Sequence, residues 1–171
     1  APAVTATVGG QSFDVTPLQF TGDAWSGEVT IAEGTPSGDA TISVSGLSDL
    51  KGNVLVPVDS VGAFTVDALR PFVVGSIPAD GSNTVPPSDI ASVIVGFSEP
   101  LDPATAISSN FTVRLGVLNI ATTATYSESD EAVLVTLVPE TGLLPGSEYS
   151  IEVAAAIADV TGNIAGESAT W

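Results

Sequence analysis

A repeated strand-and-turn pattern constrains the fold of this 171-residue chain more than any other feature of its sequence. Residues 41–53 read as an alternating strand followed by Asp-x-x-Gly-Asn, and residues 150–163 read the same way. In such a turn the Asp side chain accepts hydrogen bonds from nearby backbone amides, Gly adopts a positive φ, and Asn tolerates the bend. The sequence therefore predicts two copies of one β-rich domain.

Short strand-like segments recur along the chain at the spacing typical of a β-sandwich. Pro17 is expected to produce an edge or a kink, because proline donates no hydrogen bond to a neighbouring strand. Residues 132–138 are almost all apolar, which favours a central strand covered on both faces. The expected strands lie near residues 4–8, 13–15, 18–20, 25–31, 41–45, 64–66, 72–77, 92–97, 111–115, 122–127, 132–138 and 149–153. These patterns predict an all-β protein.

Two small domains fit the chain length and the positions of the repeats. After the first copy the chain reaches Arg70-Pro71, and a fresh strand then begins. We place the domain boundary near residues 68–72. The expected architecture is two tandem antiparallel β-sandwiches, at residues 1–70 and 71–171.

The composition excludes several kinds of chemistry. Cys, His and Met are absent, which removes disulfides, Cys or His metal ligands and a histidine general base. The 20 acidic and 3 basic residues give a formal charge of −17 at pH 7. This charge argues against nucleic acid, because counterion release needs a basic surface. No apolar stretch is long enough to cross a membrane. We expect a protein that is not an enzyme, binds no nucleic acid and does not insert into a membrane.

A set of motifs in the second half of the chain follows in order at residues 77–86, 93–103, 110–112, 134–139, 143–149 and 159–163. With this set, the second half resembles the bacterial Ig-like domains of S-layer proteins and large cell-surface proteins. The first 70 residues share with that family only the strand, the Asp-x-x-Gly-Asn turn and a closing Phe-Thr-Val-Asp strand, and they lack its usual opening segment. The chain stops at Trp171, where the family normally continues its last strand.

The resemblance implies tandem Ig-like sandwiches without catalytic residues, acting as a spacer, an adhesive stalk or a surface-lattice unit. Such a module would belong to a secreted or cell-surface bacterial protein. Its partners would be proteins or glycans at the cell surface, or neighbouring Ig-like domains of the same parent chain. The acidic, lysine-poor composition fits that location, since net charge keeps an extracellular protein soluble.

Two alternative functions stay open. The first is a carbohydrate-binding or enzyme-accessory module, in which Trp25, Tyr126, Tyr149 and Trp171 stack on sugar faces. The competing interpretation is that so few aromatic residues are all needed in the core. The second is a self-assembling filament subunit, in which a segment such as residues 3–8 fills an open sheet edge of a neighbour.

Calcium is the ion that the acidic turns suggest, because Ca²⁺ prefers oxygen ligands from Asp, Asn and backbone carbonyls. Capping of the turns by the same side chains is the competing interpretation. Glu99 and Asp102 also stand three residues apart, but an acid–base pair needs a cleft and a companion that shifts one pKa. We interpret those two residues as part of a strand-end turn. The candidate calcium ligands are Asp49, Asn53, Asp67, Asp80, Asn83 and Asp102.

Overall fold

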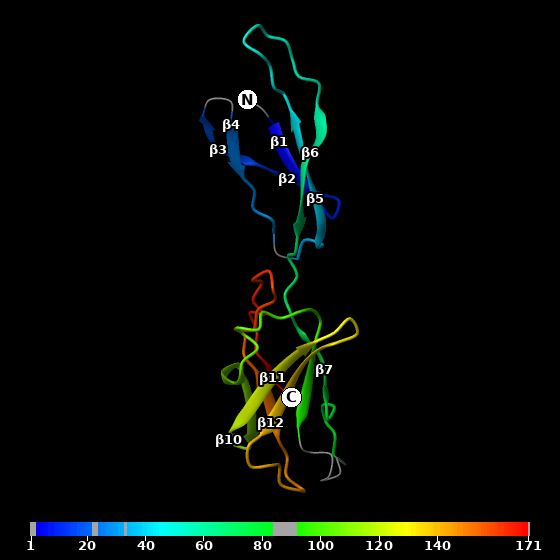
Figure 1. Cartoon of the computed structure of the whole chain (residues 1–171), viewed down its shortest axis with the longest axis vertical. Helices are drawn as coiled ribbons and strands as arrows, with labels where there is room; N and C mark the ends of the chain where they lie inside the picture. The colour runs from blue at the N-terminus through cyan, green and yellow to red at the C-terminus, as the bar shows by residue number, and fades with distance from the viewer. Residues whose placement is uncertain (1–2, 22–23, 33, 84–91, 171) are drawn as a thin grey trace. The chain divides into compact units, whose positions relative to one another are not determined.

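The computed structural model describes residues 3–21, 24–32, 34–83 and 92–170, and its regular structure is dominated by β-strands (Figure 1). The chain divides into two compact units, Ala1–Leu69 (unit 1) and Arg70–Trp171 (unit 2). Every strand pair in the described residues is antiparallel. The predicted all-β, antiparallel fold class is confirmed. No helix in the described part of the chain is long and apolar enough to span a membrane.

The strands of unit 1 form a four-stranded sheet in the order β2-β1-β5-β6 and a separate β3-β4 hairpin. The turn between β1 and β2 contains Gly9 and Gly10, both with positive φ, a conformation that glycine adopts without steric cost. The pairing of β3 shifts register between Pro17 and Gln19, so the proline lies beside an irregularity, as predicted. The strands are β1 (Ala3–Val8), β2 (Gln11–Asp14), β3 (Thr16–Thr21), β4 (Ala24–Glu28), β5 (Gly38–Ser45) and β6 (Val58–Val66).

Unit 2 forms two four-stranded sheets, in the orders β11-β12-β8-β7 and β10-β9-β13-β14. Strand β12 lies between β11 and β8, which confirms the central strand predicted from its apolar sequence. A short 3₁₀ helix, η2 (Ser108–Asn110), precedes β9. The strands are β7 (Val73–Ile77), β8 (Val93–Phe97), β9 (Phe111–Leu115), β10 (Leu118–Ile120), β11 (Thr122–Glu128), β12 (Val133–Pro139), β13 (Ser150–Val153) and β14 (Ala169–Thr170).

The two sheets of unit 2 share one hydrophobic core, as expected of a β-sandwich. Phe97 of β8 meets Phe111 of β9 edge to face, with ring centroids 6.3 Å apart and ring planes at 84°. Buried residues alternate with more exposed ones along β8, β9, β12 and β13, which follows from the two-residue period of a β-strand. The buried strand residues of this core are Val93, Val95, Phe97, Phe111, Val113, Val135, Leu137, Ile151 and Val153.

Unit 1 has a much smaller core. Its buried hydrophobic residues, among those described, are Val4, Ala6, Val8 and Ala40, all on β1 and β5. Strand β6 is exposed along its length except at its last residue. Because hydrophobic stabilisation scales with the apolar area removed from water, unit 1 gains less of it than unit 2.

The two units share one strand order, which confirms the internal repeat. The unit 1 sheet β2-β1-β5-β6 corresponds to β10-β9-β13-β14, and the β3-β4 hairpin corresponds to β11-β12. The register also agrees, since Val4 pairs with Val44 in unit 1 as Phe111 pairs with Val153 in unit 2. Unit 2 contains two further strands, β7 and β8, ahead of the shared part. The described residues of unit 1 form no counterpart of either.

Residues 3–8, considered above as a donor segment, form a central strand. Strand β1 pairs with β2 along one edge and with β5 along the other. A strand with both edges occupied has no free row of backbone groups to offer a neighbouring molecule. In this structure the segment is part of its own sheet.

Candidate functional site

Asp49 caps the first Asp-x-x-Gly-Asn turn with both of its carboxylate oxygens. Its Oδ1 accepts hydrogen bonds from the backbone N–H groups of Lys51 and Asn53, each at 2.8 Å. Its Oδ2 accepts a hydrogen bond from the Asn53 side-chain amide at 2.6 Å. Gly52 has a φ of 87°, and its N–H donates to the Asp49 carbonyl. The structure therefore brings Asp49 and Asn53 together as parts of one capped turn, as the repeat predicts.

Asp159 caps the second turn in the same way. Its Oδ1 accepts from the backbone N–H groups of Thr161 at 2.8 Å and Asn163 at 2.9 Å, and also from the Thr161 hydroxyl at 2.9 Å. Its Oδ2 accepts from the Asn163 side-chain amide at 2.7 Å. Gly162 has a φ of 96°. Two turns far apart in the sequence thus share two backbone donors and the asparagine side-chain donor, and the Thr161 hydroxyl adds one more at the second turn.

The two turns differ in what covers them. Asp159 is only 1% exposed, whereas Asp49 is exposed. In unit 2 the segment after β8 runs along the turn, with Leu101 forming an antiparallel bridge to Asp159. The Asp102 N–H donates to the Ala158 carbonyl at 2.9 Å. This covering segment belongs to the part of the sandwich that has no counterpart in the described residues of unit 1.

The hydrogen bonds of the turns stabilise the ionised carboxylates. Hydrogen bonds from the side chain and then the backbone of Asn53 lower the pKa of Asp49. Burial acts to raise the pKa of Asp159, but the combined hydrogen bonds from Asn163 and Thr161 outweigh it and lower that pKa. Donors that point at a carboxylate favour its charged form. Both aspartates are therefore built into the folded state as anions.

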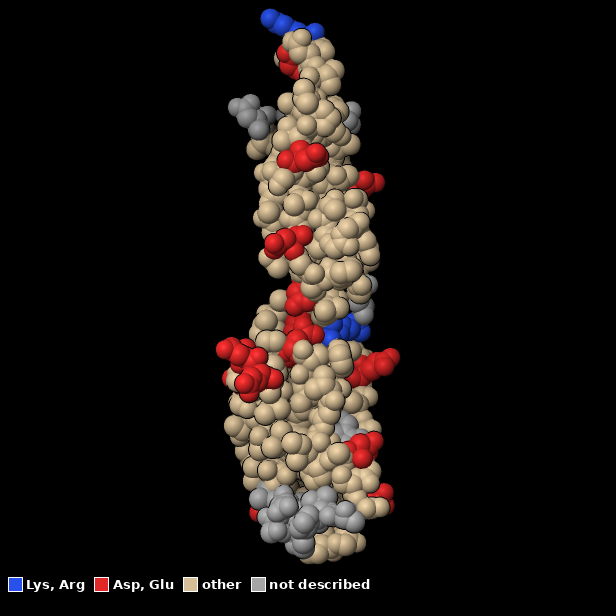
Figure 2. All heavy atoms as spheres, turned by 90° about the vertical axis from the view of Figure 1, so that its right-hand side faces the viewer, with Lys and Arg blue, Asp and Glu red and all other residues tan. Residues whose placement is uncertain are grey.

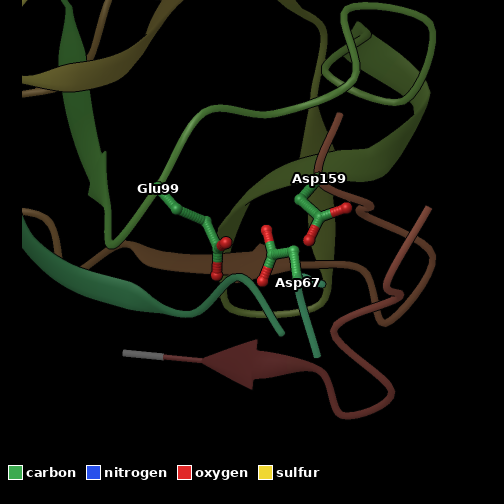
Figure 3. Close-up of side chains that lie close together, drawn as sticks. All are labelled: Asp67, Glu99 and Asp159. Atoms are coloured by element: carbon green, nitrogen blue, oxygen red, sulfur yellow. The ribbon is translucent and has the colours of Figure 1, made fainter. Parts of the chain in front are cut away.

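Glu99 approaches Asp159, and this proximity was not predicted from the sequence. Carboxylate oxygens of the two side chains lie within 4.8 Å of each other in unit 2 (Figure 3). Figure 3 also labels Asp67, which belongs to unit 1. From the sequence, Glu99 was expected in a strand-end turn with Asp102. The signal that pointed to Asp159 was the repeat itself, since Asp159 is the counterpart of Asp49, which was named as a candidate ligand.

The other predicted calcium ligands lie in separate turns. Asp67 Oδ1 accepts a hydrogen bond from the Ser37 hydroxyl at 2.8 Å and from the Leu69 N–H at 3.2 Å, within unit 1. Asp102 Oδ1 accepts from the Ala104 N–H at 2.9 Å, as expected of a turn cap. Asp80 and Asn83 are exposed, in the segment that follows β7. Calcium binding by the six residues stays a prediction.

The comparisons with known proteins place unit 2 in a family. A family model described as "Bacterial Ig-like domain" matches residues 67–171, which is more than half of the chain. The chain belongs to the bacterial Ig-like domain family. The resemblance seen in the second half of the sequence is thereby confirmed, and so is the Ig-like class of the sandwich. No curated protein matches the chain.

One solved structure similar to this bacterial Ig-like chain is the N-terminal part of the bacterial S-layer protein SbsC. The two are 24% identical in sequence, with a TM-score of 0.44. The similarity covers 60% of this chain and 23% of that chain, so it extends over less than a quarter of the S-layer structure.

The two tyrosines of the Ig-like unit make hydrogen bonds that hold its own loops. The Tyr126 hydroxyl donates to Glu128 at 2.8 Å and accepts from the Leu101 N–H at 3.1 Å. Burial, and then the hydrogen bond to Glu128, raise the pKa of Tyr126. The Tyr149 hydroxyl accepts from the Leu144 N–H at 2.7 Å. Trp25 is half-buried in unit 1, and Trp171 lies outside the described residues. A sugar-stacking role for these aromatic residues stays a prediction.

Proposed function

We propose that this chain is a non-catalytic structural module of a secreted or cell-surface bacterial protein, serving as a spacer, an adhesive stalk or a surface-lattice unit. The observation that carries the proposal is the match of residues 67–171 to the bacterial Ig-like domain family. A sandwich of two sheets with one packed core keeps its shape without a cofactor, because close-packed interiors resist deformation. A spacer or lattice unit requires that property.

The side-chain chemistry supports a role without catalysis. The sequence contains neither Cys nor His, and a hydroxyl nucleophile without an adjacent base is inert. The carboxylates of Asp49 and Asp159 are used to cap turns. These features leave binding and mechanical support as the proposed roles.

The surface charge supports an extracellular location. Acidic side chains are spread over the visible face of each unit, and basic ones are few (Figure 2). The formal net charge of −17 keeps such a protein dispersed by mutual repulsion. The proposed partners are proteins or glycans of the cell surface and neighbouring Ig-like domains of the same parent protein.

Accessibility on intact cells tests the location. An antibody raised against the purified chain should label intact producing cells as strongly as permeabilised ones, and protease added outside should remove the signal. Labelling that requires permeabilisation would contradict the proposal. A cytoplasmic protein of the same cells, probed in parallel with its own antibody, shows whether the cell membranes remained intact.

A replacement experiment separates a spacer from an adhesive or lattice unit. In the parent protein, this chain is exchanged for an unrelated tandem β-sandwich of similar length. A spacer tolerates the exchange, because only length and stiffness matter. An adhesive or lattice unit loses attachment or assembly, because its surface is gone.

Calcium binding is the part of the hypothesis that a melting experiment decides. A ligand that binds only the folded state raises the free energy of unfolding by about 2.7 kcal/mol at a hundredfold excess over its Kd. If Asp67 and the other candidate turn residues bind Ca²⁺, the melting temperature should rise from EDTA to millimolar Ca²⁺. The rise should shrink in an Asp67→Asn variant. Equal melting temperatures in the two buffers would reject calcium for this chain.

A further inference from the structure

We propose that two copies of this chain associate weakly through one sheet of unit 2, the sheet β11-β12-β8-β7. The contact surface is the side of that sheet that faces away from the core, and we call it the apolar outer face. The occupant is a second copy that packs by the same face. This inference concerns self-association of the purified chain and does not depend on the cell-surface role proposed above. The apolar residues of the face are Val74, Ile77, Ile94, Leu134 and Val138.

The strand register brings these side chains together on one side of the sheet. Every second residue of β8 is buried, which leaves Ile94 and Gly96 on the outer side. Ile94 pairs with Ile77 of β7, and Gly96 pairs with Leu134 of β12. Residues directly opposite each other in two paired strands point to the same side. A Cβ added to Gly96 would lie 3.3 Å from Val74 Cγ2, so Val74 belongs to the same surface.

The apolar outer face is exposed, and its strands are almost free of charge. Val74 and Ile77 are 61% and 66% exposed, and Val138 is 44% exposed. Strands β7, β8 and β12 contain no charged residue, and β11 contains one, Glu128, at its last position. Exposed apolar surfaces that are contiguous and rimmed by polar residues mark interaction sites.

The outer face of the other sheet has the opposite character. Arg114 of β9 forms an ion pair with Glu152 of β13, with Nη2 2.8 Å from Oε2. In the strand register, Asn119 of β10 lies opposite Arg114, and Thr170 of β14 lies opposite Glu152. These polar side chains suit contact with water, whereas strands that are apolar on both sides are typical of sheets covered on both faces. The first sheet therefore has one face in the core and a second face of the kind that normally packs against another layer.

The partner packs on the face of the sheet and does not add a strand to its edge. Strand β7 forms one edge, and its pairing with β8 shifts register between Val73 and Gly75. Such irregularities in an edge strand oppose the addition of another strand. Two sheets, in contrast, pack face to face about 10 Å apart with their side chains interdigitated.

Charge favours a second copy as the occupant. Acidic side chains stand in the turns at the ends of the sheet, at Asp130 and Glu131 between β11 and β12 and at Glu140 after β12. Two copies that meet by the apolar outer face leave these carboxylates in water at the rim. With a charge of −17 on each copy, contact through charged faces would bury or oppose like charges, which is costly. A basic partner would instead gain most from the acidic surfaces elsewhere on the chain.

The size of the face sets the strength of the association. Four strands about 4.8 Å apart, each with about five residues of about 3.3 Å, span a flat area of roughly 300 Å². Stable complexes bury about 800 Å² on each partner. The pairing is therefore weak and reversible, and the dimer is populated where copies stand at high local concentration.

Sedimentation equilibrium of the full-length chain tests the association. At protein concentrations approaching millimolar we expect monomers and dimers without larger species, because a face that meets its own copy forms a closed pair. Salt screens the repulsion between the acidic rims, so the association constant should rise about threefold or more between about 20 mM and about 0.5 M NaCl. Monomers at every concentration in both salts, species larger than a dimer, or association that weakens with salt would overturn the proposal.

Methyl NMR of the same dilution series locates the contact. The methyl signals of Val74, Ile77 and Val138 should move as the protein concentration rises. Those of Leu118 and Val160, which are exposed elsewhere on unit 2, should stay in place. Movement confined to Leu118, Val160 or the methyl groups of unit 1 would show a different contact surface and would reject the apolar outer face.

Matched substitutions complete the test. Thr125 is exposed on β11 and lies on the apolar outer face, since it pairs with Thr136, the partner of Ile94. Thr125→Glu should weaken the association about tenfold or more, because both copies then bring a carboxylate into the contact. Asn119→Glu adds the same charge at an exposed position of the other sheet and should change the association constant by less than about twofold at high salt.

Melting temperatures show whether each variant folds like the unsubstituted chain. If Thr125→Glu melts early, Thr123→Glu asks the same question, because Thr123 is also exposed on β11 and points to the same side. Equal losses of association from substitutions in the two sheets, or no loss from either, would contradict the proposed contact.

Discussion

At the scale of single residues, the Asp-x-x-Gly-Asn turns show one device in two environments. The Asp49 carboxylate accepts its hydrogen bonds in contact with solvent, whereas the Asp159 carboxylate accepts the equivalent hydrogen bonds while almost completely buried. Water can replace a lost acceptor at the first turn. At the second turn, a lost acceptor leaves buried donors without a partner, which is much more costly.

Asp159→Ala should therefore destabilise unit 2 far more than Asp49→Ala destabilises unit 1. Loss of the buried acceptor is expected to cost about 1–3 kcal/mol of unfolding free energy. Urea unfolding of the two variants and of the unsubstituted chain measures both effects. A smaller loss for Asp159→Ala than for Asp49→Ala would contradict the assigned roles.

The lowered pKa values of Asp49 and Asp159 predict acid sensitivity. Each carboxyl has a lower pKa in the folded state than in the unfolded chain, where it is about 3.9. Its contribution to stability is then complete above about pH 4 and is lost as the pH falls through the lowered folded pKa. The melting temperature should drop in that range. Asp159→Asn should flatten the drop for unit 2, and an unchanged slope would exclude this residue as a source.

At the scale of elements, the segment between β8 and η2 serves both the core and the turn of unit 2. Leu101 is fully buried and bridges Asp159, and the Leu101 N–H bonds the Tyr126 hydroxyl. Thr105 adds a second connection, since its hydroxyl accepts from the Ala158 N–H at 3.1 Å. A short loop thus ties two distant parts of the chain together.

Leu101→Ala should destabilise unit 2 by about 2–5 kcal/mol, the usual range for a leucine truncated in a core. Leu50→Ala is the matched control, because the Leu50 side chain is fully exposed in the turn of unit 1. This substitution should change the free energy of unfolding by less than about 0.5 kcal/mol. Chemical denaturation of both variants gives the comparison. Similar losses for the two leucines would show that the Leu101 segment does not pack as described.

Sequence patterns located most strands, and the failures have physical causes. The central strand β12 was predicted because its run of apolar residues is long. Strand β6 begins at Val58, several residues before the predicted start at Phe64. Its first half was missed because those exposed residues show no alternation of apolar and polar side chains. The short strand β10 was missed, since three residues carry too little pattern. In the candidate site, the Asp49–Asn53 cap was predicted from local spacing. The approach of Glu99 to Asp159 depends on tertiary packing and was not.

At the scale of the whole molecule, the two units differ in the size of their hydrophobic cores. The large core cluster lies in unit 2, while unit 1 buries only a few mostly small side chains among its described residues. Chains with more than one domain commonly depart from two-state unfolding. Unequal cores make such a departure visible.

Calorimetry of the intact chain should therefore resolve two transitions, with unit 1 melting first. Leu101→Ala should lower the upper transition and leave the lower one in place. Hydrogen exchange assigns each transition to its unit, since amides of β5 should exchange before those of β12. A single transition shifted as a whole by Leu101→Ala would contradict independent cores of unequal size.

The self-sufficient turns have a consequence for how such proteins evolve. Each turn holds its donors and its acceptors within five consecutive residues, from the aspartate to the asparagine. A duplicated gene segment that includes the codons from the aspartate to the asparagine therefore encodes all the hydrogen-bonding groups of the turn. Recombination can then lengthen or reorder the protein without first creating new partner residues. The five residues that form the capped turn would therefore also make the domain easy to duplicate, because the copy needs no partner from elsewhere in the chain to form that turn.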